Sequence, residues 1–158
     1  MTRDARFADA DPRPLALKAE DEVDLRILSS LVQDAVLTGA EISHDAKARR
    51  LALLVTRFRW EDAQAAEAEG RPFERVRSLM VIGDVMRVVS DGVQRDGDTV
   101  LELLALRWQP GEDGTGRLLL DFAGDGTIVA EVECINVDLR DVTRPHEAVS
   151  GRAPRHPD

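Results

Sequence analysis

The residues best suited to hold a ligand are arginines that gather in one part of the chain. Between residues 47 and 60 there are five basic side chains and no acidic one. Two of them, Arg57 and Arg59, are two positions apart and therefore share one face of a predicted strand. A guanidinium offers forked donors that match phosphate and carboxylate oxygens. This pattern favours a site for an anionic, for example phosphorylated, metabolite.

Arginines of later strands and both tryptophans can join this site if the fold brings them close. The full set of candidate ligand-binding residues is Arg57, Arg59, Arg75, Arg77, Arg107, Trp60 and Trp108. An indole face can stack on a cation or a base. The alternative, which we favour, is that the arginines form ion pairs with acidic residues of neighbouring strands. The acidic candidates are Glu74, Glu102, Glu131 and Glu133.

No other pattern points to catalysis, and we predict no catalytic residue, no metal site and no cofactor. Cys134 alternates with apolar residues, which predicts a buried structural thiol. The three histidines are scattered and lack the spacing of metal ligands. The glycine-rich segment 111–116 precedes a predicted strand, whereas a phosphate-binding loop needs a helix behind it. Whether the protein is an enzyme stays open, with the balance against it.

Length and charge narrow the class of protein. The chain has 158 residues, which suits one domain. Its net charge of −9 argues against binding to nucleic acid and to anionic membranes. One cysteine cannot form an internal disulfide, and residues 1–4 lack the apolar core of a secretory signal. We therefore expect a cytoplasmic protein.

The clearest predicted helix starts after Asp21, a suitable N-cap residue. Apolar residues follow at helical spacing from Leu25 to Ala35, so the helix is predicted to end near Val36. Period-two patterns then predict strands at 36–43, 50–60, 74–82, 85–90, 99–108, 117–123 and 127–139, with a short strand at 15–17. Residues 61–70 have no apolar stripe, and the sequence leaves open whether they form a short helix, a lid or a loop.

These elements predict an α+β fold, with one long N-terminal helix packed on a meandering antiparallel sheet of seven or eight strands. Residues 15–141 form the predicted domain, between a flexible arm (1–14) and a polar tail (142–158). The strand at 99–108 is apolar on both faces, so both faces need a cover. Either the sheet curls into a partial barrel or a second copy packs against it as a homodimer.

Several short segments also resemble a known family when taken in order. They are Arg57-Phe58-Arg59-Trp60-Glu61, Leu101-Glu102-Leu103-Leu104-Ala105, Gln109-Pro110-Gly111-Glu112, Phe122-Ala123-Gly124 and Val132-Glu133-Cys134-Ile135. Together they resemble the alphaproteobacterial domain-of-unknown-function family numbered 2948, over most of the chain. The resemblance implies a small cytoplasmic bacterial protein and assigns no chemistry to any residue.

Two hypotheses of function follow. The first is a non-enzymatic accessory or protein-interaction module that associates with itself, because strands apolar on both faces call for a partner. The second is a binding protein or small enzyme for an anionic metabolite, which uses the arginine cluster. Under the second hypothesis, replacing Arg57 and Arg59 together abolishes binding and leaves the fold intact, whereas unfolding of that variant shows that the two arginines are structural.

Overall fold

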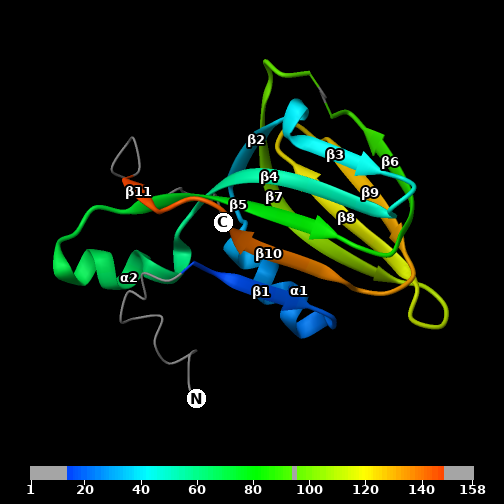
Figure 1. Ribbon diagram of the computed structural model, residues 1–158, viewed down its shortest axis with the longest axis horizontal. Helices are drawn as coiled ribbons and strands as arrows, with labels where there is room; N and C mark the ends of the chain where they lie inside the picture. Colours follow the sequence, from blue (N-terminus) through cyan, green and yellow to red (C-terminus); the bar gives the residue numbers. More distant parts are fainter. Residues whose placement is uncertain (1–13, 94–95, 148–158) are drawn as a thin grey trace.

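The computed structural model describes residues 14–93 and 96–147, and most of them belong to one curled antiparallel sheet (Figure 1). Within this part of the chain the strand order is β1-β10-β5-β4-β2-β7-β8-β9-β6, with β3 beside β4 and β11 beside β5. The strands are β1 (Ala16–Ala19), β2 (Ala35–Thr38), β3 (Ile42–Asp45), β4 (Arg50–Phe58), β5 (Glu74–Ile82), β6 (Val85–Asp91), β7 (Val100–Pro110), β8 (Gly116–Phe122), β9 (Thr127–Val132), β10 (Val137–Asp141) and β11 (His146–Glu147).

The curl of the sheet encloses the hydrophobic core. Strands β5 and β6 are joined only by Gly83 and Asp84, yet β6 pairs with β9 in the other half of the sheet. One core cluster therefore holds residues from both halves, such as Met80 of β5 and Ile128 of β9. Within the described residues, β1 and β6 stand at the two ends of the strand order. The sheet thus covers much of its own inner face.

The predicted α+β fold with a long N-terminal helix is wrong, because the chain is mostly sheet. The helices α1 (Glu22–Leu31) and α2 (Trp60–Glu69) have only ten residues each, and a short 3-10 turn, η2, covers Gly39–Glu41. The start of α1 is as predicted, since the Asp21 carboxylate accepts a hydrogen bond from the Asp24 N–H at 2.8 Å. The helix ends early because Asp34 takes a left-handed φ of 64° and the next residues pair with β7 as strand β2.

A β-bulge explains why β7 has apolar residues at both odd and even positions. The register of β7 against β8 shifts between Leu103 and Ala105. Leu101, Leu103 and Leu106 are all buried as a result, although strict alternation would place Leu106 on the opposite face from Leu103. The bulge accounts for the pattern within one chain. The homodimer therefore needs other support and stays a prediction.

The segment that the sequence left open, 61–70, is helical. Helix α2 ends at Gly70, which takes a left-handed φ of 67° and donates its N–H to the carbonyls of Ala66 and Glu67. Asp62, Ala65 and Ala66 are buried. The helix is therefore held by small residues and charged contacts rather than by an apolar stripe. Residues 142–147 continue from β10 beside β5, and the rest of the predicted tail and arm lies outside the described residues, apart from Pro14.

Gly116 gives a direct test of the packing around Trp108. A Cβ at Gly116 would lie 2.5 Å from the indole Cη2 of Trp108 and 2.6 Å from the carbonyl oxygen of Gln109. We expect Gly116→Ala to lower the free energy of unfolding by about 1–3 kcal/mol, because backbone and indole must both move. Gly97→Ala is the control, since its new Cβ would make an ordinary 3.7 Å contact with Ala40. Urea unfolding of both variants measures the difference, and equal stability would contradict it.

Candidate functional site

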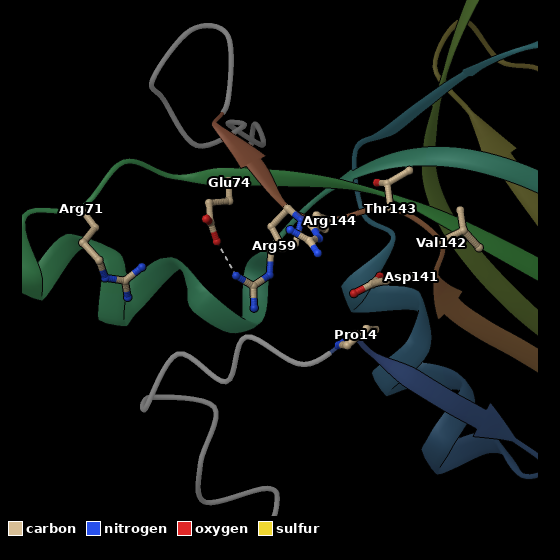
Figure 2. A pocket seen from close by; sticks show the side chains of 9 residues that line it. Pro14, Arg59, Arg71, Glu74, Asp141, Val142, Thr143 and Arg144 are labelled. Atoms are coloured by element: carbon tan, nitrogen blue, oxygen red, sulfur yellow. Dashed lines mark hydrogen bonds and ion pairs between the residues drawn. The ribbon is translucent and has the colours of Figure 1, made fainter.

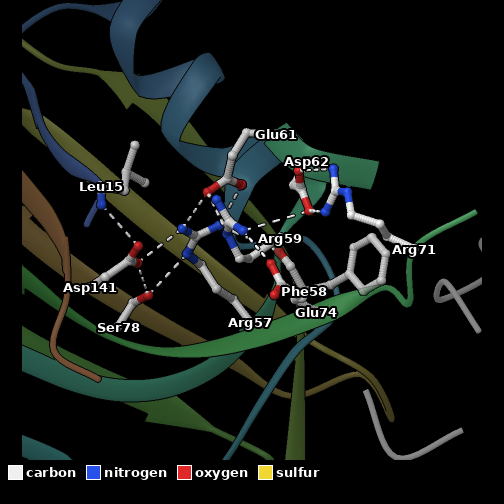
Figure 3. A network of polar contacts seen from close by, with 10 residues as sticks. All are labelled: Leu15, Arg57, Phe58, Arg59, Glu61, Asp62, Arg71, Glu74, Ser78 and Asp141. Atoms are coloured by element: carbon white, nitrogen blue, oxygen red, sulfur yellow. Dashed lines mark hydrogen bonds and ion pairs between the residues drawn. The ribbon is translucent and has the colours of Figure 1, made fainter. Parts of the chain in front are cut away.

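A buried charge network occupies one end of the sheet, centred on Arg57 (Figure 3). Arg57 lies at the end of β4, on the same face as the core residues of that strand, and its side chain is fully buried. Both of its Nη groups donate to the carboxylate of Glu61, at 2.9 and 2.8 Å. Its Nη2 also donates to Asp141 at 2.9 Å, and its Nε donates to the Ser78 hydroxyl at 2.9 Å. The guanidinium is thus held by β5, β10 and the start of α2.

Asp141 joins this network to the first strand. Its Oδ1 accepts from Arg57 and from the Ser78 hydroxyl, the latter at 2.7 Å. Its Oδ2 accepts the backbone N–H of Leu15 at 2.9 Å. The Asp141 side chain is only 3% exposed. One carboxylate therefore connects segments from both ends of the described chain.

The network keeps Arg57 charged despite its burial. Loss of water by itself lowers the pKa of a buried guanidinium. The hydrogen bonds and the negative charge of Glu61, followed by those of Asp141, outweigh this effect and raise the pKa of Arg57 above its ordinary value. Two carboxylates thus face one arginine in a largely dry environment. This arrangement is a structural ion cluster rather than an open ligand site.

A second set of charges continues along α2. Arg59 forms an ion pair with Glu74 and lies 3.6 Å from the carboxylate of Asp62. Asp62 is buried, and it accepts two hydrogen bonds of 3.2 Å from Arg71. Glu61 and Asp62 lie in the first turn of the helix, where its dipole stabilises negative charge. These contacts fix α2 against the start of β5.

A cavity of about 650 Å³ opens beside this network (Figure 2). It lies between α2 and the segment that follows β10. Its lining residues are Pro14, Arg59, Arg71, Glu74, Asp141, Val142, Thr143, Arg144 and Pro145. Its volume is in the range of pockets that hold small organic molecules. Three arginines and two carboxylates therefore face a space of metabolite size.

The structure separates the predicted arginine cluster into different environments. In the β4–β5 register, Thr56 lies opposite Arg77 and Phe58 lies opposite Arg75. Residues directly opposite each other share a face, so Arg75 and Arg77 lie on the other face of the sheet from Arg57. Arg75 lies over the Phe58 ring, 5.9 Å from its centroid, and Arg77 forms an ion pair with Glu41. The predicted strand face shared by Arg57 and Arg59 is wrong as well, because β4 ends at Phe58 and Arg59 is the N-cap residue of α2.

The remaining candidates lie apart from the cavity lining. Arg107 is exposed and pairs with Asp121 across β7 and β8, with one hydrogen bond of 3.0 Å. The Trp60 Nε1 donates to the carbonyl of Gln33 at 3.1 Å. Trp108 packs against the core. Of the seven candidates, only Arg59 lines the cavity, and ligand binding by the others stays a prediction.

The ion pairs agree in part with the alternative interpretation of the arginines. Glu74, Glu131 and Glu133 do pair with arginines, namely Arg59, Arg87 and Arg49. Reasoning from sequence did not identify the residues that complete the site, which are Ser78, Asp62, Arg71, Asp141, Thr143 and Arg144. The sequence around Asp62 and Asp141 does not indicate that they are buried. The segments that bury them come together only in the folded chain. A polar Ser78 at a core parity of β5 was the one available clue.

The prediction that Cys134 is buried is wrong, because this residue is exposed in a bend after β9. Strand β9 ends at Val132, so the alternation that predicted burial does not reach the cysteine. The thiol donates to an Asp84 oxygen at 3.4 Å. Partial desolvation, followed by the hydrogen bond and charge of Asp84, raises the pKa of the Cys134 thiol. The contact disfavours the thiolate, which is the reactive form.

Slow alkylation of Cys134 is the expected consequence. At neutral pH, iodoacetamide should react with this thiol more slowly than with a free cysteine peptide, although the side chain is exposed. Asp84→Asn should speed the reaction, because it removes the nearest negative charge. The rate measured against pH gives the comparison. An unchanged rate in the variant would show that Asp84 does not control this thiol.

Within residues 14–93 and 96–147, no group of three or more histidine, cysteine, aspartate or glutamate side chains is placed to hold a metal ion. In the same part of the chain, neither helix has the length and apolar character that crossing a bilayer requires.

The fold and the cavity define a small, mostly antiparallel sheet protein with a charged pocket at one end of its sheet. The chain belongs to the domain-of-unknown-function family 2948, whose model matches residues 15–156 and whose description is "protein of unknown function". Comparison with curated proteins and with solved structures gives no match. The match confirms the predicted membership of family 2948, and it assigns no chemistry to any residue.

Proposed function

We propose that this protein binds a small organic anion, with a phosphate or carboxylate group, in the cavity between α2 and the segment after β10. The observation that carries this proposal is the lining, in which Arg59, Arg71 and Arg144 face one space of about 650 Å³. The proposed setting is the cytoplasm, where phosphorylated and carboxylated metabolites are abundant.

The charges of the lining favour an anion over a cation. Glu74 is paired with Arg59, and Asp141 is paired with Arg57, so both carboxylates are already neutralised by arginines. Arg144 is exposed and forms no ion pair within the described residues. Its guanidinium is therefore available to a ligand oxygen. Arg59 and Arg71 are themselves paired, with Glu74 and with Asp62, so Arg144 is the cation of the lining that remains to attract an anion.

Thr143 adds a neutral donor to the same wall. Its Oγ1 accepts the backbone N–H of Arg77 at 3.1 Å. A hydroxyl that accepts in this way still has its own proton to donate. Thr143 and Arg144 are adjacent, so together they offer a hydroxyl and a guanidinium to one ligand group. Such a pair of donors is typical of phosphate and carboxylate sites.

The first test is thermal unfolding in the presence of inorganic phosphate, pyrophosphate or citrate, each against sodium chloride of equal ionic strength. A ligand at 100 times its Kd adds about 2.7 kcal/mol to the free energy of unfolding. For a chain of this size, that corresponds to a rise in Tm of roughly 5–10 °C. We expect at least one of these anions to raise the Tm of the native protein.

Arg144→Glu distinguishes binding in the cavity from a general salt effect. The variant should lose the anion-dependent rise in Tm and keep the Tm that the native protein has in chloride. Arg50→Glu is the matched control, because Arg50 is also an exposed arginine but lines a different cavity. The proposal fails if no anion raises the Tm, or if Arg144→Glu responds as Arg50→Glu does.

A self-associating interaction module is the second candidate function. It is favoured by a different feature, the edge of β6 from Arg87 to Asp91, which pairs with no other strand among the described residues.

A further inference from the structure

We propose that two copies of this chain associate through the free edges of their β6 strands, antiparallel and around a two-fold axis at Val89. This inference is independent of the proposed anion site. Strand β6 pairs with β9 along one edge and ends the strand order of the described residues (Figure 1). At its first residue the other edge is occupied, because the Val85 N–H donates to the carbonyl of Arg49 at 3.0 Å, so the free part of this edge begins at Arg87. An unpaired edge presents N–H and C=O groups that can bind another strand.

The directions in which the backbone N–H and C=O groups of β6 point are consistent with this axis. Backbone groups of successive residues point to alternate edges of a strand. The Phe122 N–H bonds the carbonyl of Gly126, and the Glu133 N–H bonds the carbonyl of Asp84. On β9, therefore, Thr127, Val129 and Glu131 point their backbone groups toward β6.

The partners of those β9 residues in the register are Asp91, Val89 and Arg87. These three residues of β6 use their backbone groups to bond β9. The backbone groups of Val88 and Ser90 consequently point to the free edge. A two-fold axis at Val89 sets Val88 of one copy opposite Ser90 of the other, so each such pair can exchange both of its hydrogen bonds.

The outer side chains of β6 are complementary to themselves around the same axis. Arg87, Val89 and Asp91 share the outer face, and all three are exposed. With the axis at Val89, the two valines meet each other. Arg87 of each copy then lies opposite Asp91 of the other, which gives two symmetric ion pairs. Opposite charges at directly facing positions stabilise strand pairing.

The rest of the outer face repeats this complementarity across three strands. The β8–β9 and β9–β6 registers form three rows that run to the free edge. The middle row is apolar, with Leu119, Val129 and Val89, and it would continue into the same row of the second copy. The neighbouring row in the first copy consists of Arg117, Glu131 and Arg87. It would continue into a row of the second copy that consists of Asp91, Thr127 and Asp121. Where the two copies meet, a positive side chain therefore faces a negative one, and like charges do not face each other.

The net charge of −9 on each copy does not prevent this contact at physiological salt. The Debye length there is about 8 Å, so distant charges are largely screened while directly facing pairs are not. The occupant of this edge is therefore a second copy of the chain. An unrelated peptide would have no reason to match the order Arg87, Val89, Asp91 in reverse.

Charge exchange tests the register of this dimer. Sedimentation equilibrium of the native protein should show a reversible dimer. Arg87→Glu and Asp91→Arg should each weaken it by on the order of tenfold or more in Kd, because each change places like charges at both symmetric pairs. The double variant with both changes should restore dimerisation. A native protein that stays monomeric overturns the proposal, as does a double variant no better than the single ones.

Two further variants test the edge without depending on charge. Ser90→Pro removes an N–H that points away from β9, so it should abolish the dimer while Tm in dilute solution stays near the native value. In a Cys134→Ser background, Val89→Cys should form an intermolecular disulfide on mild oxidation, because the two copies of residue 89 face each other. Val100→Cys is the control, since Val100 is 66% exposed on another strand. Equal crosslinking of both variants would overturn the proposed axis.

Discussion

Replacing Arg57 with alanine is expected to lower the free energy of unfolding by about 3–5 kcal/mol, the usual cost of removing one partner from a buried charge cluster. The variant leaves Glu61 and Asp141 close together, with side chains only 10% and 3% exposed. It also removes the donor to Ser78. Urea unfolding followed by circular dichroism measures the loss. Because a domain of this size has a marginal total stability, the variant should be partly unfolded near physiological temperature.

Arg107→Ala is the matched control for this prediction. Arg107 also has a carboxylate partner on a neighbouring strand, but its side chain is 58% exposed. An exposed pair contributes about 0–1 kcal/mol, so the control should change stability little. Arg57→Lys should lie between the two, since lysine keeps the charge and loses the forked geometry. A loss in Arg57→Ala no larger than that in Arg107→Ala would contradict a structural role for the network.

Asp141→Ala is expected to have the second-largest effect, about 3 kcal/mol. Its carboxylate accepts hydrogen bonds from Arg57, from Ser78 and from the backbone of Leu15. Removing it takes this acceptor from the Ser78 hydroxyl and the Leu15 N–H, and it leaves Glu61 as the one carboxylate on Arg57. Asp141→Asn should cost less, about 1–2 kcal/mol, because the amide oxygen still accepts while the charge is lost.

A double-mutant cycle separates the ion pair from the other contacts of Asp141. Arg57→Ala and Asp141→Ala together should cost less than the sum of the single changes, because both remove the same interaction. Once Arg57 is absent, Asp141→Ala removes a carboxylate that has already lost its cation, so this second change costs less than it does in the native protein. Losses that simply add would show that the two residues act independently, contrary to the contacts in Figure 3.

These expectations differ from the ligand-binding role that was predicted for Arg57. The composition of residues 47–60 indicated a place of high positive charge but could not show where the compensating carboxylates lie. Glu61 is only four positions away, whereas Asp141 is 84 positions from Arg57. The double replacement of Arg57 and Arg59, which the binding hypothesis predicts to leave the fold intact, is expected to unfold the protein. Arg144, in the predicted polar tail, is the better residue for that test.

Most strands were predictable, but their assembly was not, and the predicted strands at 36–43 and 127–139 each correspond to two strands in the structure. Alternation and turn residues located β4, β5 and β8 to within a few residues, because these strands have one buried face. The helix was predicted too long because β2 continues its apolar spacing. Because the β7 bulge adds one residue, a strand with one buried face has a sequence pattern that is apolar on both faces. In each case the missing information was pairing between distant segments, which a local pattern does not contain.

The link between Leu15 and Asp141 also has a consequence for the order of folding. These residues are 126 positions apart, and β1 pairs with β10 beside them. A growing chain therefore carries Arg57 for more than eighty residues before the carboxylate of Asp141 has been synthesised. Contacts of such separation slow folding, because a long loop must close before they form. The cavity is lined by Pro14 and by Pro145, which are far apart in the sequence, so it can exist only after that closure. In a refolding experiment, binding of the proposed anion should therefore appear only after β1 has paired with β10.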